Sequence, residues 1–384
     1  MLYTLKASQI YTEDKIMDNC HLLIDDDIIF SIDVQHHCDD STLIDVSKYK
    51  IIPGLIDLHI HGCYGYDSMD SSVDALKIIS NELVKYGVTS FLPTTVTSQW
   101  EKIKATVHNI RLAMDMDLSG ALILGGYIEG PFISKEQKGA HPEGSIMKIN
   151  LNIIEEIVRE NPDTIKILTL APELTEVPEL IRYLKTNNIN ISLGHTNATF
   201  DETIKAIDLG ADLAVHTFNG MRALHHREPG VVGAVLINDS IFSELIADNI
   251  HVHPAVMKIL VKVKGSDKVI LVSDSMRATG LPDGIYSLGD MQVTVKNSIA
   301  KTSNGSLAGS TLKLIDGVKN MIKTVGIDPL QAVHMASLNP AKYLKLDKSL
   351  GSIAPGKKAN LTIIDDDFKV IATIINGKIV YQTW

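Results

Sequence analysis

Two histidines, His59 and His61, stand two positions apart at the end of an apolar segment, and Gly62 follows them directly. Side chains along a β-strand alternate between its faces, so residues two apart project the same way, with Cα atoms ~6.6 Å apart. Neutral imidazole nitrogen is a good ligand for zinc-like metal ions. The spacing therefore indicates a strand end that could hold a metal ion. Two polar residues that merely close a strand would give the same pattern.

Three more residues of metal-binding type follow other apolar segments. Glu129 precedes a Gly-Pro pair, His195 follows Gly194, and His216 follows Val215. Each has an ordinary alternative: a solvated turn carboxylate, a helix cap, or a buried histidine that the backbone satisfies. Together with the first pair they supply four imidazoles and one carboxylate, enough ligands for one or two divalent ions. Such an ion lowers the pKa of a bound water to ~7 and polarises a carbonyl group.

Asp274 ends a further apolar segment. A carboxylate beside such an ion can take a proton from water as a general base and later deliver it to a leaving amine. An aspartate that only begins a turn is the alternative. The sequence has no G-x-S-x-G nucleophile motif and no Walker or Rossmann glycine pattern. We therefore predict metal-dependent hydrolysis with Asp274 as the catalytic acid and base.

Residues 219–230 concentrate basic side chains in a chain whose formal net charge is −10. Arg227 and His226 could bind an anion there, with help from Asn219 and backbone N–H groups. His251, at another predicted strand end, is a second candidate for the anion side. A surface loop with an arginine–glutamate pair is the alternative.

These residues need a scaffold that brings strand ends together. Apolar strand-like segments alternate with amphipathic helical ones, which predicts parallel strands joined by helices. The predicted strands are the segment before His59 and residues 89–93, 122–129, 165–171, 189–195, 213–216, 244–248 and 269–274; the predicted helices include residues 71–86, 311–325 and 329–344. Eight such strands match a (β/α)8 TIM-like barrel, in which reactive residues gather at the C-terminal strand ends.

Both ends of the chain differ from this centre. They contain short segments rich in β-branched residues, separated by Asx and Gly turns, without helical periodicity. We predict that residues 1–52 and 356–384 pair into one small β-sandwich domain. Residues 53–355 then form the barrel domain.

The overall composition restricts the class of protein. A chain of 384 residues with 45% apolar and 21% charged residues suits a soluble globular protein. No apolar run approaches the ~20 residues needed to span a bilayer, and the net negative charge argues against a nucleic-acid partner. The three scattered cysteines (Cys20, Cys38 and Cys63) fit reduced thiols, and the N-terminus lacks a secretory signal. We therefore expect a cytoplasmic protein.

The motifs resemble the amidohydrolase superfamily and, within it, the family of N-acetylglucosamine-6-phosphate deacetylases. The matching segments are residues 53–62, 128–132, 138–142, 193–199, 216–221, 224–230, 251–254, 271–276 and 307–311, followed by the tail 339–365. The resemblance covers nearly the whole chain. It implies hydrolysis of the acetamide of a phosphorylated N-acetyl amino sugar, giving the free amino-sugar phosphate and acetate. It also implies a homodimer.

The resemblance further implies a ligand set for one or two metal ions per subunit, with zinc or iron expected. Glu129, His195 and His216 resemble the ligands of the main ion. His59 and His61 resemble the ligands of a second ion, which some relatives hold and others lack. Asp274 resembles the catalytic acid and base, and the resemblance also gives it a contact with the second ion.

Other positions resemble substrate contacts of the family. His141 resembles the residue beside the substrate carbonyl. The expected substrate-binding residues are Asn219, Gly220, Arg227 and His251, with His226 nearby, together with Ala140, and Leu307 beside the acetyl group. Whether residues 225–228 act on their own or on a neighbouring subunit's site is left open. Gly220, Arg222, Ala223 and Asn249 differ from the residues that relatives more often carry, without replacing an assigned catalytic group.

Three alternatives remain at this point. The substrate could be N-acetylgalactosamine 6-phosphate. The protein could be a cyclic-amide hydrolase of the same superfamily, although Glu129 stands where many of those use a carbamylated lysine. It could also be a barrel without catalysis, but such proteins would be expected to lose metal ligands.

Overall fold

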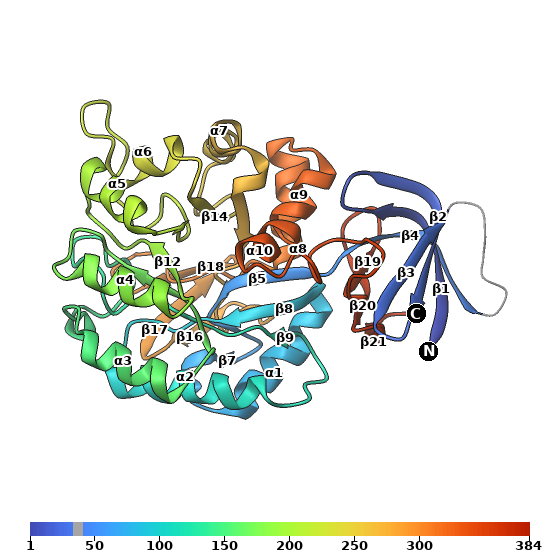
Figure 1. Cartoon of the computed structure of the whole chain (residues 1–384), viewed down its shortest axis with the longest axis horizontal. Coiled ribbons are helices and arrows are strands. Elements are labelled where there is room, and N and C mark those ends of the chain that lie inside the picture. The colour runs from blue at the N-terminus through green and yellow to red at the C-terminus, as the bar shows by residue number, and fades with distance from the viewer. Residues whose placement is uncertain (34–40) are drawn as a thin grey trace.

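The computed structural model describes residues 1–33 and 41–384, so Cys38, His36 and His37 lie outside the described residues. Figure 1 shows a large lobe of helices around a central set of strands, with a smaller lobe of strands beside it. Both chain ends lie in the smaller lobe. Within the described ranges, no helix is long and apolar enough to cross a membrane.

The large lobe is the predicted barrel, and its described strands occupy eight positions. They are β5 (Leu55–Ile60), β8 (Val88–Pro93), β9 (Leu122–Ile123) with β10 (Gly126–Ile128), β11 (Ile165–Leu170), β12 (Asn190–Leu193), β13 (Leu213–Ala214), β14 (Phe242–Ile246) and β15 (Val269–Val272). All the hydrogen-bonded pairs among them are parallel. Single bridges from Thr94 to Tyr127 and from Ile60 to Ser275 join the two arcs into a ring. The barrel therefore closes on itself.

The barrel strands read as continuous apolar segments because helices cover the outside and side chains fill the inside. Every residue of β5 and of β8 is buried. The third strand, predicted as continuous over 122–129, is interrupted between β9 and β10. Gly125 lies there at φ +146°, and a Cβ on it would come within 2.7 Å of the Thr164 carbonyl oxygen. Only glycine fits this kink.

The helices run α1 (Val73–Leu83), α2 (Trp100–Met114), α3 (Leu151–Glu160), α4 (Val177–Thr186), α5 (Phe200–Leu209), α6 (Gly230–Ile237), α7 (Pro254–Lys264), α8 (Leu314–Asn320), α9 (Pro329–Met335) and α10 (Leu338–Tyr343). The predicted helix 71–86 is α1 followed by a 3-10 turn, and 311–325 is α8 followed by a π-helical turn. The helix predicted over 329–344 is two helices. Pro340 explains this break, since its ring would collide with the carbonyl of Ala336 in a continuous helix.

The small lobe joins the two chain ends as predicted. Its strands are β1 (Leu2–Tyr11), β2 (Ile16–Asp25), β3 (Ile28–Asp33), β4 (Thr42–Pro53), β19 (Leu361–Ile364), β20 (Val370–Ile375) and β21 (Lys378–Gln382). They form one seven-stranded sheet in the order β21-β20-β19-β4-β1-β2-β3, with β19 antiparallel to β4. The exact domain boundaries at 52/53 and 355/356 stay a prediction.

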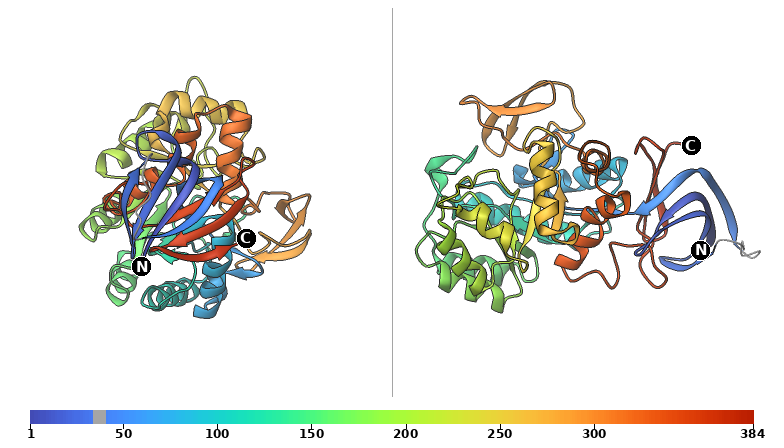
Figure 2. Two further views of the ribbon diagram at one scale, coloured as in Figure 1. Left: turned by 90° about the vertical axis from the view of Figure 1, so that its right-hand side faces the viewer. Right: turned by 90° about the horizontal axis from the view of Figure 1, so that it is seen from above.

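A small antiparallel sheet is inserted after the last barrel strand. It comprises β16 (Gly284–Leu288), β17 (Met291–Lys296) and β18 (Ile299–Thr302), and Figure 2 shows it standing out at one side of the barrel. Arg277 connects this sheet to the barrel. Its Nε donates to the Ser287 carbonyl at 2.9 Å. Its other two nitrogens donate to the Gly65 carbonyl and to the Asp70 carboxylate, in and beside the hairpin of β6 (Gly62–Cys63) and β7 (Tyr66–Asp67).

Candidate active site

A cavity of about 200 Å³ lies where the barrel strands end. It collects residues from positions far apart in the sequence. The predicted site residues that line it are His61, Glu129, Ala140, His141, His195, His216, Asn219, Gly220, His251, Asp274 and Leu307. His59 is completely buried and lies within 3.6 Å of Glu129, so it joins the same group from the barrel interior. The predicted gathering of strand ends is therefore observed.

The backbone turns sharply at three of these positions. His195 has φ +46°, His216 has φ +27° and Asp274 has φ +49°. Residues with a Cβ seldom adopt this left-handed region, and each instance costs on the order of 1–3 kcal/mol. Each residue lies just beyond its barrel strand, where the turn directs the side chain into the cavity. The packed barrel holds these strained conformations in place.

The carboxylate of Glu129 lies between two sets of imidazoles. Its Oε1 is 3.1 Å from Nε2 of His195 and 2.9 Å from Nε2 of His216. Its Oε2 is 3.6 Å from Nε2 of His59 and 3.4 Å from Nε2 of His61. One oxygen thus faces each pair of histidines. Burial would raise the pKa of Glu129, but the charge of His59 and the hydrogen-bonded ring nitrogens of His195 and His216 hold that pKa well below its ordinary value.

Asp274 faces the first pair of histidines. Its Oδ1 is 3.1 Å from Nε2 of His61 and 3.7 Å from Nε2 of His59. Burial opposes both charges, but the contact between His61 and Asp274 prevails. It raises the pKa of His61 to about 9 and lowers the pKa of Asp274 to about 2. Asp274 is therefore ionised over the whole physiological range, as a proton acceptor must be.

The Nδ1 atoms of the four histidines point away from the cavity and toward hydrogen-bond acceptors. His195 contacts the carbonyl of Gln137 at 2.9 Å, His216 that of Asn219 at 3.1 Å, and His61 that of Thr94 at 3.3 Å. The Nδ1 of His59 instead contacts a carboxylate, Oε2 of Glu244, at 3.1 Å. In each ring Nε2 is the atom that faces the Glu129 carboxylate, which is the arrangement that outer hydrogen bonds give to metal-binding histidines.

In His141 the two ring nitrogens have the opposite roles, because Nδ1 is the acceptor and Nε2 carries the proton. Its Nδ1 accepts a hydrogen bond from the backbone N–H of Thr97 at 3.2 Å. Burial and the neighbouring His195 hold the pKa of His141 well below its ordinary value, so the ring is neutral and carries its proton on Nε2. That N–H lies 3.6 Å from Oε2 of Glu129 at the cavity wall. His141 is therefore placed as a hydrogen-bond donor rather than as a metal ligand.

His251 lies on the cavity wall with its ring paired to a carboxylate. Its Nδ1 lies 2.6 Å from Oδ2 of Asp248, whose other oxygen accepts the backbone N–H groups of Ile250 and His251. Burial works against a charged ring, but the hydrogen bond and charge of Asp248 raise the pKa of His251 above its ordinary value. The imidazole is thus held with its other nitrogen free for an anion.

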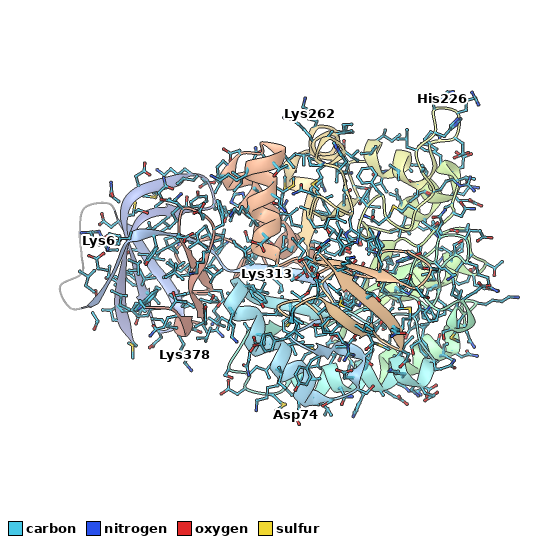
Figure 3. The ribbon with its side chains drawn as sticks, turned by 180° about the vertical axis from the view of Figure 1, so that it is seen from behind. Lys6, Asp74, His226, Lys262, Lys313 and Lys378 are labelled. Atoms are coloured by element: carbon cyan, nitrogen blue, oxygen red, sulfur yellow. The ribbon has the colours of Figure 1, made fainter. Side chains whose placement is uncertain are left out.

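Two predicted anion-binding residues lie elsewhere. Arg227 and His226 are exposed and do not line the cavity of their own chain. Figure 3 shows His226 at the outer tip of a projecting loop. The guanidinium of Arg227 contacts Nε2 of His226 at 2.9 Å, so the two side chains form one cationic group there. Their role in substrate binding stays a prediction, because neither side chain reaches the cavity of its own chain.

The residues of the cavity fit a divalent metal ion. His59, His61 and Asp274 offer ligand atoms that all lie within 4.8 Å of one another. Nε2 of His195 and Nε2 of His216 lie 3.1 Å and 2.9 Å from Oε1 of Glu129. Nε2 of His59 is a buried polar atom without a hydrogen-bond partner among the described residues. Leaving such an atom unpaired is costly unless something else binds it. Buried imidazole and carboxylate together are the donor types that zinc and iron accept.

Sequence reasoning missed several residues of the site. Val96, Leu288 and Ser306 line the cavity, and Glu244 contacts Nδ1 of His59 beside it. Asp248, which ends a predicted strand, was expected at this edge but not as the partner of His251. The inserted sheet that delivers Leu288 was not predicted. For Glu244 a signal existed, because a charged residue inside an otherwise apolar barrel strand needs a partner.

The chain belongs to the amidohydrolase family, whose sequence profile matches residues 51–380. Within it, the chain is 40% identical over 354 residues to an N-acetylglucosamine-6-phosphate deacetylase of Vibrio furnissii, covering 92% of this chain and 88% of that protein. It is 38% identical over 379 residues to an N-acetylgalactosamine-6-phosphate deacetylase of Escherichia coli O157:H7, covering 99% of each. The predicted family is confirmed.

The fold also matches a solved structure. A mutant of N-acetyl-D-glucosamine-6-phosphate deacetylase from Mycobacterium smegmatis, in complex with N-acetyl-D-glucosamine-6-phosphate, aligns with a TM-score of 0.94 and 27% identity over 99% of this chain and 100% of that one. The predicted barrel with a domain formed by both chain ends is therefore confirmed by comparison as well.

Proposed function

We propose that this protein hydrolyses the N-acetyl group of N-acetylglucosamine 6-phosphate to give glucosamine 6-phosphate and acetate. The observation that carries this proposal is the shared cavity, in which Glu129 lies between two histidine pairs and Asp274 faces one of them. A neutral donor, His141, lies on the same wall. Metal ligands, a proton acceptor and a carbonyl-binding donor are thus within reach of one small substrate group.

In this proposal Glu129, His195 and His216 hold the main metal ion, while His59 and His61, together with Asp274, hold a second. Zinc and iron both suit these ligands. When bound, such an ion lowers the pKa of water to ~7 and polarises a carbonyl group. The two oxygens of Glu129 face different histidine pairs, which suits a carboxylate shared between two sites.

Asp274 and His141 divide the remaining work. Asp274, ionised and facing the cavity, takes a proton from the attacking water and passes it to the departing nitrogen. The Nε2–H of His141 donates a hydrogen bond to the acetyl oxygen, where negative charge develops in the transition state. Because the neighbouring backbone N–H fixes the ring's polarity, this donor needs no rearrangement.

The rest of the cavity binds the sugar and its phosphate. His251, whose pKa Asp248 raises, attracts the phosphate, and Asn219 and Gly220 add polar contacts along the same wall. Leu307 and Ala140 enclose the acetyl methyl group.

Arg227 and His226 serve a neighbouring subunit in this proposal. They are exposed on a loop that also exposes Leu224, at 53%, with Ile237 of α6 exposed at 67%. An apolar side chain such as Leu224, exposed on a loop with a cationic tip, suits contact with a second copy of the chain. We propose a cytoplasmic homodimer in which this loop brings Arg227 to the partner's phosphate site.

The direct test is acetate release by metal-loaded protein from N-acetylglucosamine 6-phosphate. The 38% identical relative named for N-acetylgalactosamine 6-phosphate makes that epimer the second candidate. Values of kcat/KM for both sugars, measured side by side, decide between them. If neither sugar released acetate, the proposal would be contradicted.

A further inference from the structure

Glu244 is a carboxylate in the interior of the barrel that neither ligates in the proposed mechanism nor contacts the substrate cavity. It lies in the middle of β14 and is 0% exposed. A buried charge of this kind costs several kcal/mol unless hydrogen bonds and charges compensate for it. Its contacts therefore indicate why the chain retains it.

Those contacts all lead to the metal ligands. Oε2 of Glu244 is 3.1 Å from Nδ1 of His59 and 3.2 Å from the backbone nitrogen of His216. Oε1 has no hydrogen-bond partner among the described residues. One oxygen thus contacts a ligand from each of the two proposed metal sites, on strands that lie on different parts of the ring.

His59 is the histidine that most needs such support. His61, His195 and His216 place Nδ1 against backbone carbonyls, which the fold itself fixes. His59 has a side-chain acceptor instead. Its ring packs edge-on against His61, with centroids 5.2 Å apart, and tilted against Tyr127 at 4.9 Å. Ring packing leaves open which nitrogen faces inward, so a specific acceptor on one side decides it.

We propose that Glu244 is a positioning residue, which holds the imidazole of His59 with Nε2 directed at the metal shared with His61. The inference rests on the proposed function, because it assumes that His59 ligates an ion there. A carboxylate that accepts from a ring nitrogen makes a charge-assisted hydrogen bond, stronger than one to a neutral carbonyl. It acts through His59 and touches neither ion nor substrate.

Two variants separate positioning from charge. Glu244→Leu has similar volume and removes both hydrogen bonds without leaving a large cavity. Glu244→Gln removes the charge but keeps an oxygen that can accept from Nδ1 of His59 and from the His216 nitrogen. Asp248→Asn is the matched control. Asp248, four residues further on, is also a carboxylate next to a histidine Nδ1, and its side chain is only 8% exposed, but its histidine is His251, which is not a proposed metal ligand.

The experiment titrates metal-free protein with zinc alone and follows heat and bound zinc per chain. His59→Asn identifies the binding step that belongs to the His59 and His61 pair. We expect Glu244→Leu to weaken that step by about 10–100-fold, the usual effect of losing an outer hydrogen bond to a metal ligand. Glu244→Gln should stay closer to the wild type than to Glu244→Leu, and Asp248→Asn should match the wild type. Thermal unfolding of each metal-free variant verifies that it is folded.

Wild-type zinc affinity in Glu244→Leu would overturn the proposal. So would equal losses in Glu244→Gln and Glu244→Leu, since charge alone would then explain the effect. The proposal would also be overturned if His59→Asn bound zinc as the wild type does, because His59 would then not be a ligand that Glu244 could position. Acetate release by the wild type, measured on the same zinc-loaded sample, tests the proposed function separately.

Discussion

At the scale of single residues, this site depends on which atom of each side chain faces the cavity. His61 and His141 are both buried histidines near Glu129, yet they are suited to different tasks. The carbonyl of Thr94 leaves Nε2 of His61 for a ligand role, whereas the N–H of Thr97 leaves Nε2 of His141 as a donor. The partner of Nδ1 therefore decides the role.

The first residue-scale prediction concerns Asp274. Asp274→Asn removes the proton acceptor but leaves Glu129, His195 and His216 in place. We expect kcat to fall by about 10²–10⁴-fold, the usual contribution of general acid–base catalysis, while zinc stays bound at the main site. Steady-state kinetics and metal analysis of one preparation test both parts. Turnover at the wild-type rate would remove the catalytic role from Asp274.

The second residue-scale prediction concerns pH. The pKa of His251 is raised by Asp248, so the ring is positive below that raised value and loses its charge as pH rises through it. We expect KM for the phosphorylated sugar to increase over that pH range. Asp248→Asn removes the larger of the two causes of the shift, the other being the charge of Asp274, so the increase should begin at lower pH. The measurement is KM against pH for both proteins.

N-acetylglucosamine without phosphate is the control for that measurement. Its KM should not follow the titration of His251, because it carries no anion for the ring to attract. If both sugars showed the same pH dependence, His251 would not be the phosphate contact.

At the scale of elements, the strand ends place the ligands and small residues permit their close approach. Gly194 lies between the end of β12 and His195, and a Cβ there would lie 1.9 Å from Cγ1 of Val215. We expect Gly194→Ala to lower the free energy of unfolding by about 1–3 kcal/mol, the usual cost of inserting a methyl group into a packed core. Denaturant unfolding of the metal-free protein measures this change.

Gly144 provides the matched control. It lies in a 3-10 turn at the surface, and a Cβ there would meet nothing within 4 Å. Gly144→Ala should change the free energy of unfolding by no more than about 0.5 kcal/mol. Equal effects at both positions would show that packing between β12 and β13 does not limit residue 194.

At the scale of the whole molecule, the open question is where Arg227 acts. Its loop projects from the barrel, and its side chain does not line its own cavity. Arg227→Ala should raise KM for the phosphorylated sugar and leave hydrolysis of the unphosphorylated sugar unchanged. If Arg227 acts on the cavity of its own chain, a dimer with one substituted chain should show the raised KM only in the cavity of that chain.

A mixing experiment separates the two arrangements. Asp274→Asn chains keep Arg227, and Arg227→Ala chains keep Asp274. Exchange of subunits between the two variants should therefore restore sites that combine both residues, and kcat/KM should rise above that of either variant alone. No rise after demonstrated subunit exchange would place Arg227 in its own subunit's function or on the surface.

The sequence by itself determined the elements and the types of residue at their ends. Apolar strand segments, their alternation with helices, and His59, His61, Glu129 and Asp274 at the boundaries are local patterns, and parallel strands bring such ends to one edge. Local signals also had limits. The break at Gly125 and the division of residues 329–344 into α9 and α10 depend on close contacts and on one proline.

Only the tertiary structure decided how the site works in detail. Glu244 and His59 are 185 positions apart, and no local pattern states that one carboxylate will meet one ring nitrogen. The same holds for the donor polarity of His141 and for the exclusion of Arg227 from its own cavity. Secondary structure follows from neighbours in the chain, whereas hydrogen-bond partners inside a barrel depend on how strands distant in sequence pack around it.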